Sequence, residues 1–281
     1  MRLDIEPEVF ASADPVATID LIILTLDGRH EWQPSLPVAS AAVQFVARQV
    51  PALSEYMQKV LVEAANPATP AAAAAKVRAG DLRAVLADLS KPAVLVVENR
   101  IGDGGFVRAV AAALRDQRIV DALQGDNDWL RLSNGGGCGQ MPDLAAEECR
   151  AFSMLVRVAV LFDSDRVEPD EPSPHHDKVA KCREAGVREV HLLTWRMMEN
   201  YVPFPVWERH FPARINQIEE LRTRIPRQRG YQNLKDEFGR RNMPKRMFPD
   251  DLPLTEEDFA ELGPGVVTEL RELLAMIHRI L

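Results

Sequence analysis

Three carboxylates follow two apolar segments of this 281-residue sequence, at the point where each segment ends or shortly after it. Glu98 follows the segment AVLVV at 93–97. Asp163 follows VRVAVLF at 156–162, and Asp165 comes two residues later. Such nearly unbroken, β-branched segments are typical of central strands in parallel sheets, and ligands gather at the carboxyl ends of those strands. Because side chains two apart on a strand point the same way, we expect Glu98, Asp163 and Asp165 to converge at one edge of a sheet.

A group of carboxylates of this kind predicts a divalent cation. Two unit charges about 4 Å apart repel by roughly 4 kcal/mol at an effective dielectric constant near 20. A bound cation removes that repulsion, and oxygen ligands favour Mg²⁺, Mn²⁺ or Ca²⁺ over zinc. We expect Mg²⁺ or Mn²⁺, which keep open positions for phosphate oxygens. Relief of repulsion also predicts that the metal-free Asp165→Asn variant is at least as stable as wild type.

Two further acids can reach the same edge of the sheet. Asp103 lies five residues after Glu98 at the start of a predicted helix, so it can bind the metal or cap the helix. Glu199 lies beyond a predicted strand at 187–193 and can be a fourth metal ligand or a residue that supports one. Its structural alternative is an ion pair with a basic neighbour such as Arg196.

The elements that must position these acids alternate between strand and helix. The predicted strands are four apolar segments, at 93–97, 129–132, 156–162 and 187–193. Between them lie stretches with apolar residues at helical spacing, at 105–115, 141–152 and 175–185. This alternation predicts an α/β fold with a mostly parallel sheet and helices on both faces.

The chain divides into three predicted parts. Residues 1–90 are typical of helix and connectors and carry no evident chemistry, so we expect a helical support region. Residues 91–205 hold the predicted sheet and its acids. Residues 206–281 predict a mainly helical C-terminal region with a closing helix from about 266.

A basic stretch at 222–246 offers a surface for phosphate groups. Nine Lys and Arg residues stand there against two acids, with Tyr231 and Phe238 among them. The candidates for nucleic-acid contact are Arg240, Arg241, Lys245 and Arg246. The alternative interpretation is a solvated helical face.

Two other features have both a functional and a structural interpretation. The segment NGGGCG at 134–139 can cradle phosphate through backbone amides, or it can be only a turn. The pair His175 and His176 lies in an acidic, proline-rich loop, and we expect these side chains to be solvated rather than metal-bound. Cys138 has no convincing base near it in sequence, so we assign it no role.

Bulk composition narrows the class of protein. The net charge is −8, so binding to nucleic acid needs metal ions or a local basic surface. The three cysteines form no CxxC pair, which argues against a disulfide framework or a zinc ribbon. The first residues, MRLDIEPEVF, lack the apolar core of a signal peptide, and no apolar segment reaches the length of a membrane span. We therefore expect a cytoplasmic protein that makes no membrane contact.

Residues 93–203 resemble a TOPRIM domain, the catalytic fold shared by topoisomerases, bacterial primases, recombination proteins and OLD-type nucleases. The family pattern is an apolar strand ending in Glu, a following acid, and a later strand ending in Asp-x-Asp. This sequence has AVLVVENRIGDGGF and VAVLFDSDR in that order. The segment MMENYVP at 197–203 resembles the Glu-Asn-Tyr segment of nuclease-type members in bacterial defence and in the OLD group.

The resemblance implies a metal-dependent nuclease that cleaves phosphodiester bonds, with Glu98, Asp163 and Asp165 as its catalytic residues. It also implies an antiviral or toxin-like role. A separate ATPase partner is implied as well, because no GxxxxGK[ST] motif is present. The acid after Glu98 lies five residues on, where about four is usual in the family. Two alternatives remain: a primase-like nucleotidyl-transfer enzyme, and a non-catalytic TOPRIM-like interaction module.

Overall fold

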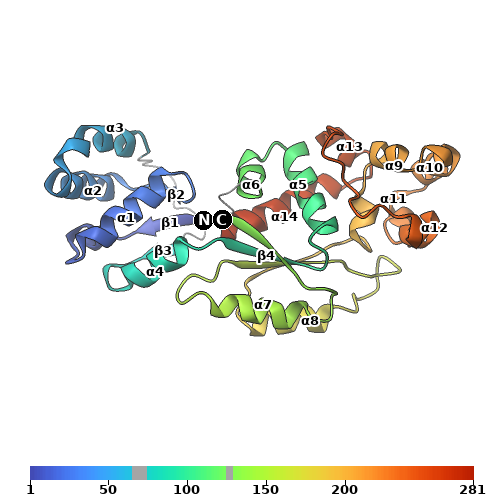
Figure 1. Ribbon diagram of the computed structural model, residues 1–281, viewed down its shortest axis with the longest axis horizontal. Helices are drawn as coiled ribbons and strands as arrows, with labels where there is room; N and C mark the ends of the chain where they lie inside the picture. The colour runs from blue at the N-terminus through green and yellow to red at the C-terminus, as the bar shows by residue number, and fades with distance from the viewer. Residues whose placement is uncertain (65–74, 125–128) are drawn as a thin grey trace. The chain divides into compact units, whose positions relative to one another are not determined.

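The computed structural model describes residues 1–64, 75–124 and 129–281. They form two compact units, and each unit has its own parallel sheet (Figure 1). The smaller unit comprises Met1–Pro92, Ala151–Arg157 and Leu281. The larger unit comprises Ala93–Arg150 and Val158–Ile280, so it holds every acid that the sequence singles out.

The smaller unit contains a sheet that the sequence did not predict. Its three parallel strands lie in the order β2-β1-β3, with bounds β1 Arg2–Ile5, β2 Glu31–Trp32 and β3 Ala75–Val77. The helices are α1 Pro15–Leu26, α2 Leu36–Gln49, α3 Ser54–Ala64 and α4 Leu82–Leu89. The strands have four residues or fewer, which is too short for an alternating pattern to stand out from neighbouring helices. The expectation of a region made mainly of helix and connectors did not include this sheet.

The larger unit contains the predicted four-stranded sheet. Its strands are β4 Ala93–Val97, β5 Leu130–Asn134, β6 Val158–Phe162 and β7 Glu189–Leu192. They lie in the order β5-β4-β6-β7, and every neighbouring pair is parallel. Every residue of β4 and β6 is buried, as expected for apolar central strands covered on both faces. The predicted α/β class and parallel sheet are thus confirmed.

Helices cover both faces of this sheet (Figure 1). One face packs against α7 Met141–Arg150 and α8 His176–Glu184. The other packs against α14 Val266–Ile280, with α5 Gly102–Ala113 and α6 Gln117–Ala122 on the same side. The predicted helices begin and end within a few residues of these bounds.

The order of the strands identifies the place on the sheet where a ligand is expected to bind, between β4 and β6. From β4 the chain crosses to β5 on one side, and from β5 it returns to β6 on the other side of β4. The carboxyl ends of β4 and β6 therefore flank a topological switch point, where open α/β sheets bind their ligands. Glu98 and Asp163 are the residues that follow these two strands.

The C-terminal region folds as short helices around an aromatic cluster. They are α9 Phe204–His210, α10 Ile215–Thr223, α11 Pro226–Arg229, α12 Leu234–Phe238 and α13 Glu256–Ala260. The Trp207 ring stacks on Phe238 with centroids 4.3 Å apart. Within the predicted basic stretch Arg229 is only 3% exposed, and Arg224 pairs with Glu220 and Glu237. The stretch is therefore a folded part of the unit and not one continuous solvated helix face.

Among the residues that the structure describes, every helix is too short or too polar to cross a membrane.

Candidate active site

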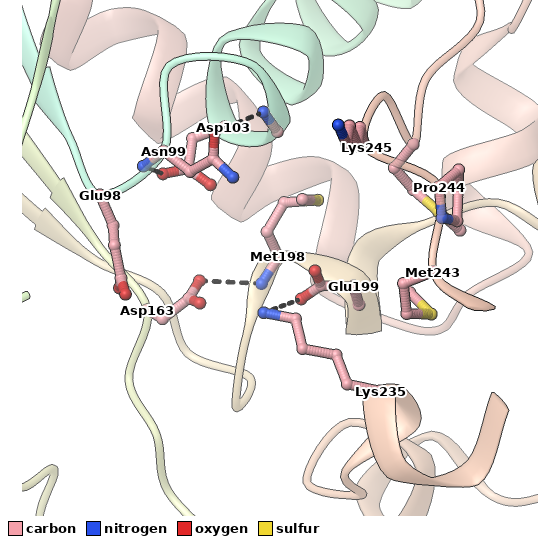
Figure 2. Close-up of a pocket in the computed structure, with 12 residues that line it drawn as sticks. Glu98, Asn99, Asp103, Asp163, Met198, Glu199, Lys235, Met243, Pro244 and Lys245 are labelled. Carbon is pink, nitrogen blue, oxygen red and sulfur yellow. Dashed lines mark hydrogen bonds and ion pairs between the residues drawn. The ribbon is translucent and has the colours of Figure 1, made fainter. Parts of the chain in front are cut away.

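A cavity of about 140 Å³ opens beside the carboxyl ends of β4 and β6 (Figure 2). We call it the carboxylate cavity, because Glu98, Asp103, Asp163 and Glu199 line it. Lys235, Lys245 and three methionines complete much of its wall. Glu98 and Asp163 reach in from the sheet, while the lysines come from the C-terminal region. Segments far apart in the sequence thus build one acidic site.

The turn after β4 places Asp103. The side chain of Asn99 accepts hydrogen bonds from the N–H groups of Ile101 and Gly102, at 3.0 and 3.3 Å, and so starts α5. Asp103 accepts from the N–H of Asn99 at 2.9 Å. Capping of the first turn thus falls to Asn99, and the Asp103 carboxylate closes the turn while lining the cavity. Desolvation raises the pKa of Asp103 to about 6, with contributions from Glu199 and Glu98, against the Asn99 hydrogen bond.

Asp163 lies at the end of β6 beside two other acids. Its Oδ1 accepts from the N–H of Met198 at 2.8 Å, which fixes the carboxyl at the end of β6. Desolvation and the charges of Asp103 and Glu199 raise the pKa of Asp163 well above its usual range. The metal-free site therefore favours a proton on this carboxyl, and a cation would replace that proton.

Glu199 meets an ammonium group inside the cavity. Its carboxylate is buried, and Oε2 lies 3.1 Å from Lys235 Nζ (Figure 2). Lys235 lies on α12, and desolvation alone would lower its pKa. The neighbouring charges of Glu199 and Asp163 outweigh that effect and raise the pKa. The pairing with Arg196 considered from sequence is replaced by this one.

The rest of the Glu-Asn-Tyr segment positions Glu199. It forms a short 3₁₀ helix, Met198–Tyr201. The Asn200 amide donates to the backbone oxygens of Arg229 and Gln232, at 2.9 and 3.1 Å. The Tyr201 hydroxyl donates to Glu269 at 2.7 Å and accepts from the N–H of Trp195. Both side chains are buried, so they anchor the segment while Glu199 faces the cavity.

Asp165 lies elsewhere in the described structure and does not line the carboxylate cavity. Its φ is +52°, so the extended backbone assumed from the sequence ends before it and its side chain turns away. Its carboxylate lies 2.8 Å from His175 Nε2, and this hydrogen bond holds the pKa of Asp165 below its usual value. The expectation of a solvated His175 was wrong, because that ring is only 5% exposed.

The His175 ring connects Asp165 to the glycine-rich turn. Its Nδ1 lies 2.9 Å from Lys178 Nζ, which in turn lies 3.1 Å from Cys138 Sγ. The turn itself is held to the sheet by the Gly135 N–H, which donates to the oxygen of Val97 at 2.8 Å. Contact between this turn and phosphate stays a prediction.

The four basic candidates occupy different positions. Lys245 lines the carboxylate cavity. Arg240 pairs with Asp236, and Arg246 pairs with Asp250. Arg241 is exposed. Only Lys245 is therefore placed to meet a group bound among the acids.

The donor set fits a hard divalent cation. Four carboxyl groups face two ammonium groups, a formal excess of two negative charges when all are ionised. Oxygen donors of this kind suit Mg²⁺ or Mn²⁺. Across residues 1–64, 75–124 and 129–281, however, no three acid, histidine or cysteine side chains already converge as a metal site. Lys235 is the cation that meets the acids in this arrangement, so metal binding requires the side chains to close around the ion.

Sequence reasoning missed Lys235 and Asn99. Lys235 stands within the basic stretch, but nothing in its spacing separates it from its neighbours. Asn99 follows Glu98 and precedes a predicted helix, which is a position where an Asx side chain commonly accepts N–H groups. The position of Asn99 could therefore have identified it as the residue that caps this helix.

The pKa of Asp103 predicts a pH-dependent stability difference in the metal-free protein. The folded state holds this proton up to about pH 6, while the unfolded chain releases it near 3.8. In that window the folded state binds more protons, so the Asp103 contribution to the free energy of unfolding falls as the pH rises. Asp103→Asn should therefore gain about 2–3 kcal/mol relative to wild type between pH 4 and pH 7. Urea unfolding in EDTA measures this, and a difference that does not change with pH would contradict the assignment.

Comparisons with protein-family models, with curated proteins and with solved structures found no match for this chain.

Proposed function

We propose that this protein is a Mg²⁺- or Mn²⁺-dependent nuclease of the TOPRIM type, which cleaves phosphodiester bonds in DNA or RNA. One observation carries the proposal. Glu98 and Asp163 follow the two strands at the switch point of a parallel sheet and line one cavity with two further acids and two lysines. Metal-dependent cleavage of a phosphodiester uses both kinds of group, because acids hold the metal ion and cationic side chains bind the phosphate oxygens.

In this proposal the acidic residues bind the metal ion and the lysines bind the phosphate. Glu98, Asp103, Asp163 and Glu199 would hold the metal, which when bound polarises a phosphodiester and lowers the pKa of a bound water. Lys245 would meet a non-bridging phosphate oxygen as a point charge. Lys235, once released from Glu199, would do the same and offset negative charge that develops during cleavage.

The methionines of the wall serve a different purpose. Met198, Met243 and Met247 line the cavity beside the lysines. Their apolar side chains would lower the local dielectric constant and so strengthen electrostatic interactions with a bound phosphate.

The family resemblance supports the same conclusion. The strand that precedes Glu98 lies next to the strand that precedes Asp163 and Asp165, and the Glu-Asn-Tyr segment places Glu199 at the same cavity. Asp165 pairs with His175 outside the cavity, so its role as a metal ligand stays a prediction. The antiviral or toxin-like role, the ATPase partner and the cytoplasmic location remain implications of the resemblance and of the sequence.

A cleavage assay tests the proposal. Supercoiled plasmid, linear DNA and RNA are incubated with the protein in Mg²⁺, Mn²⁺ or EDTA, beside Glu98→Gln and Asp163→Asn proteins purified in the same way. We expect metal-dependent cleavage of at least one substrate by wild type and its loss in both variants. No cleavage under any condition, or equal cleavage by the variants, would refute it. Nucleotide-dependent strand growth would instead support the primase-like alternative.

A further inference from the structure

A second cavity, of about 250 Å³, lies beside the first and is lined by arginines. We call it the arginine cavity, after Arg100, Arg108, Arg131 and Arg246. Its apolar lining is formed by Ile101, Leu123, Leu130, Leu132 and Phe248. No acid lines it among the described residues. The guanidinium groups that lack a carboxylate partner leave positive charge beside an apolar surface, and an anion in the cavity would offset that charge.

The arginines differ in how they are neutralised. Arg131 pairs with Glu148, and Arg246 pairs with Asp250 in an exposed ion pair. Arg100 and Arg108 make no ion pair in the part of the chain that the structure describes. Exposed ion pairs contribute little to stability, so Arg246 can exchange its partner for a phosphate at little cost. Two unpaired guanidinium groups and one exchangeable one are thus available to an anion.

Two segments separate the arginine cavity from the carboxylate cavity. Along the turn that starts α5, Asn99 and Asp103 line the carboxylate cavity, while Arg100 lines the arginine cavity. In the C-terminal region, Lys245 lines the carboxylate cavity and its neighbour Arg246 lines the arginine cavity. Residues that are adjacent in sequence, with Cα atoms about 3.8 Å apart, thus line the two cavities, so the cavities are close enough for one chain-like ligand to contact both.

We propose that the arginine cavity binds an unpaired nucleic-acid strand next to the phosphate that is cleaved. This inference rests on the proposed function and adds a substrate preference to it. Guanidinium groups bind phosphate oxygens through paired N–H donors. The apolar lining provides a surface for base faces, which a single strand exposes and a duplex covers. Phe248 is buried against Phe106, with ring centroids 5.8 Å apart, so packing holds this part of the lining in place.

Binding measurements test the proposal without cleavage. Fluorescence anisotropy in EDTA follows a labelled single-stranded DNA, its RNA counterpart and the matching duplex, over a series of salt concentrations. The test protein is Arg100→Gln/Arg108→Gln. The control is Arg183→Gln/Arg188→Gln, which removes the same charge from exposed positions of the same unit.

Wild type should bind a single strand more tightly than the duplex. The test variant should bind it about tenfold more weakly, with the slope of log K against log salt reduced by about 1.4, or roughly 0.7 for each lost phosphate contact. The control should stay within about twofold of wild type. Arg100→Lys/Arg108→Lys should recover only part of the lost affinity, because it keeps the charge but not the paired N–H donors. Thermal melts of each protein confirm that the variants are folded.

The outcomes separate this proposal from the proposed function. Equal binding by the test and control variants, or tighter binding of the duplex, would overturn the arginine cavity as a strand site even if wild type cleaves nucleic acid with metal. Displacement of the strand by equimolar mononucleotide would also overturn it, because the cavity would then be a small-ligand site. Arginine-dependent strand binding without cleavage in any metal would support the cavity and refute the nuclease.

Discussion

The Asp163→Asn variant is expected to be more stable than wild type in the absence of metal, and to lose both cleavage and its response to Mg²⁺. Asp163 is held among Asp103 and Glu199, and its raised pKa shows that the folded protein disfavours its charge. Between the ordinary pKa of 3.8 and this raised pKa the folded state holds a proton that the unfolded chain has released, so the free energy of unfolding falls as the pH rises through that range. Asparagine removes the charge and can still accept the Met198 N–H. At pH 8 in EDTA we expect a gain on the order of 2 kcal/mol.

The stabilisation by Mg²⁺ and the rate of cleavage should both be lower in Asp163→Asn than in wild type, although its metal-free stability is higher. Millimolar Mg²⁺ should raise the melting temperature of wild type by mass action, and that of Asp163→Asn much less. Cleavage should fall by at least about a hundredfold, as when a group that stabilises transition-state charge is removed. A destabilised metal-free variant would mean that Asp163 has a structural role and would contradict this account.

Asp165→Asn supplies a matched control with the opposite sign in stability. Sequence alone predicted relief of repulsion at this position, but the Asp165 carboxylate pairs with His175 and its pKa is lowered. Its side chain is partly exposed, so loss of the charge should lower stability by only about 0.5–1 kcal/mol. The positive φ adds no penalty, because asparagine adopts the left-handed region as readily as aspartate. Equal shifts for the two variants would contradict the different environments in the structure.

The Lys235→Met variant is expected to be unstable without metal and to recover with it. Methionine keeps the length of the side chain and removes the ammonium that pairs with Glu199 and faces Asp163. Removing one partner from a buried ion pair leaves the other uncompensated. Because Lys235 is partly exposed, we expect a loss of about 2 kcal/mol at pH 8 in EDTA.

Mg²⁺ should stabilise Lys235→Met more than wild type, because no ammonium then competes for the acids. Lys245→Met is the matched control, since Lys245 is exposed and lines the same cavity. Its stability should stay within about 0.5 kcal/mol of wild type. Thermal melts of the three proteins, with and without Mg²⁺, measure this. Similar small losses in both variants would show that Lys235 does not neutralise the site.

The central sheet and its acids were predictable because their signals are local. The segments that became β4 and β6 are apolar at almost every position, and this pattern marks strands buried on both faces. Parallel order then places Glu98 and Asp163 at one edge. The three short strands of the smaller unit gave no such signal, and residues 1–90 were predicted to be mainly helix and connectors.

Other parts of the site depend on a single backbone angle and on long-range packing, which a local sequence pattern does not encode. One backbone angle, the φ of +52° at Asp165, turns that side chain from the expected cluster toward His175. Lys235 reaches the acids only because the C-terminal region packs beside the sheet edge. The arginine cavity likewise joins Arg100 and Arg108 to Arg246, from distant segments. Long-range packing decides which charges meet, and a single sequence does not show it.

Locating Mn²⁺ in crystals of the protein tests the central claim most directly. Crystals grown without metal are soaked in millimolar MnCl₂, and anomalous difference maps are calculated for wild type and for Asp163→Asn. We predict a Mn²⁺ peak in the wild-type carboxylate cavity within bonding distance of Glu98 and Asp163, with Lys235 displaced from Glu199, and no peak there in the variant. A wild-type cavity that binds no Mn²⁺ while Lys235 stays on Glu199, or a Mn²⁺ ion bound away from these acids, would contradict the account.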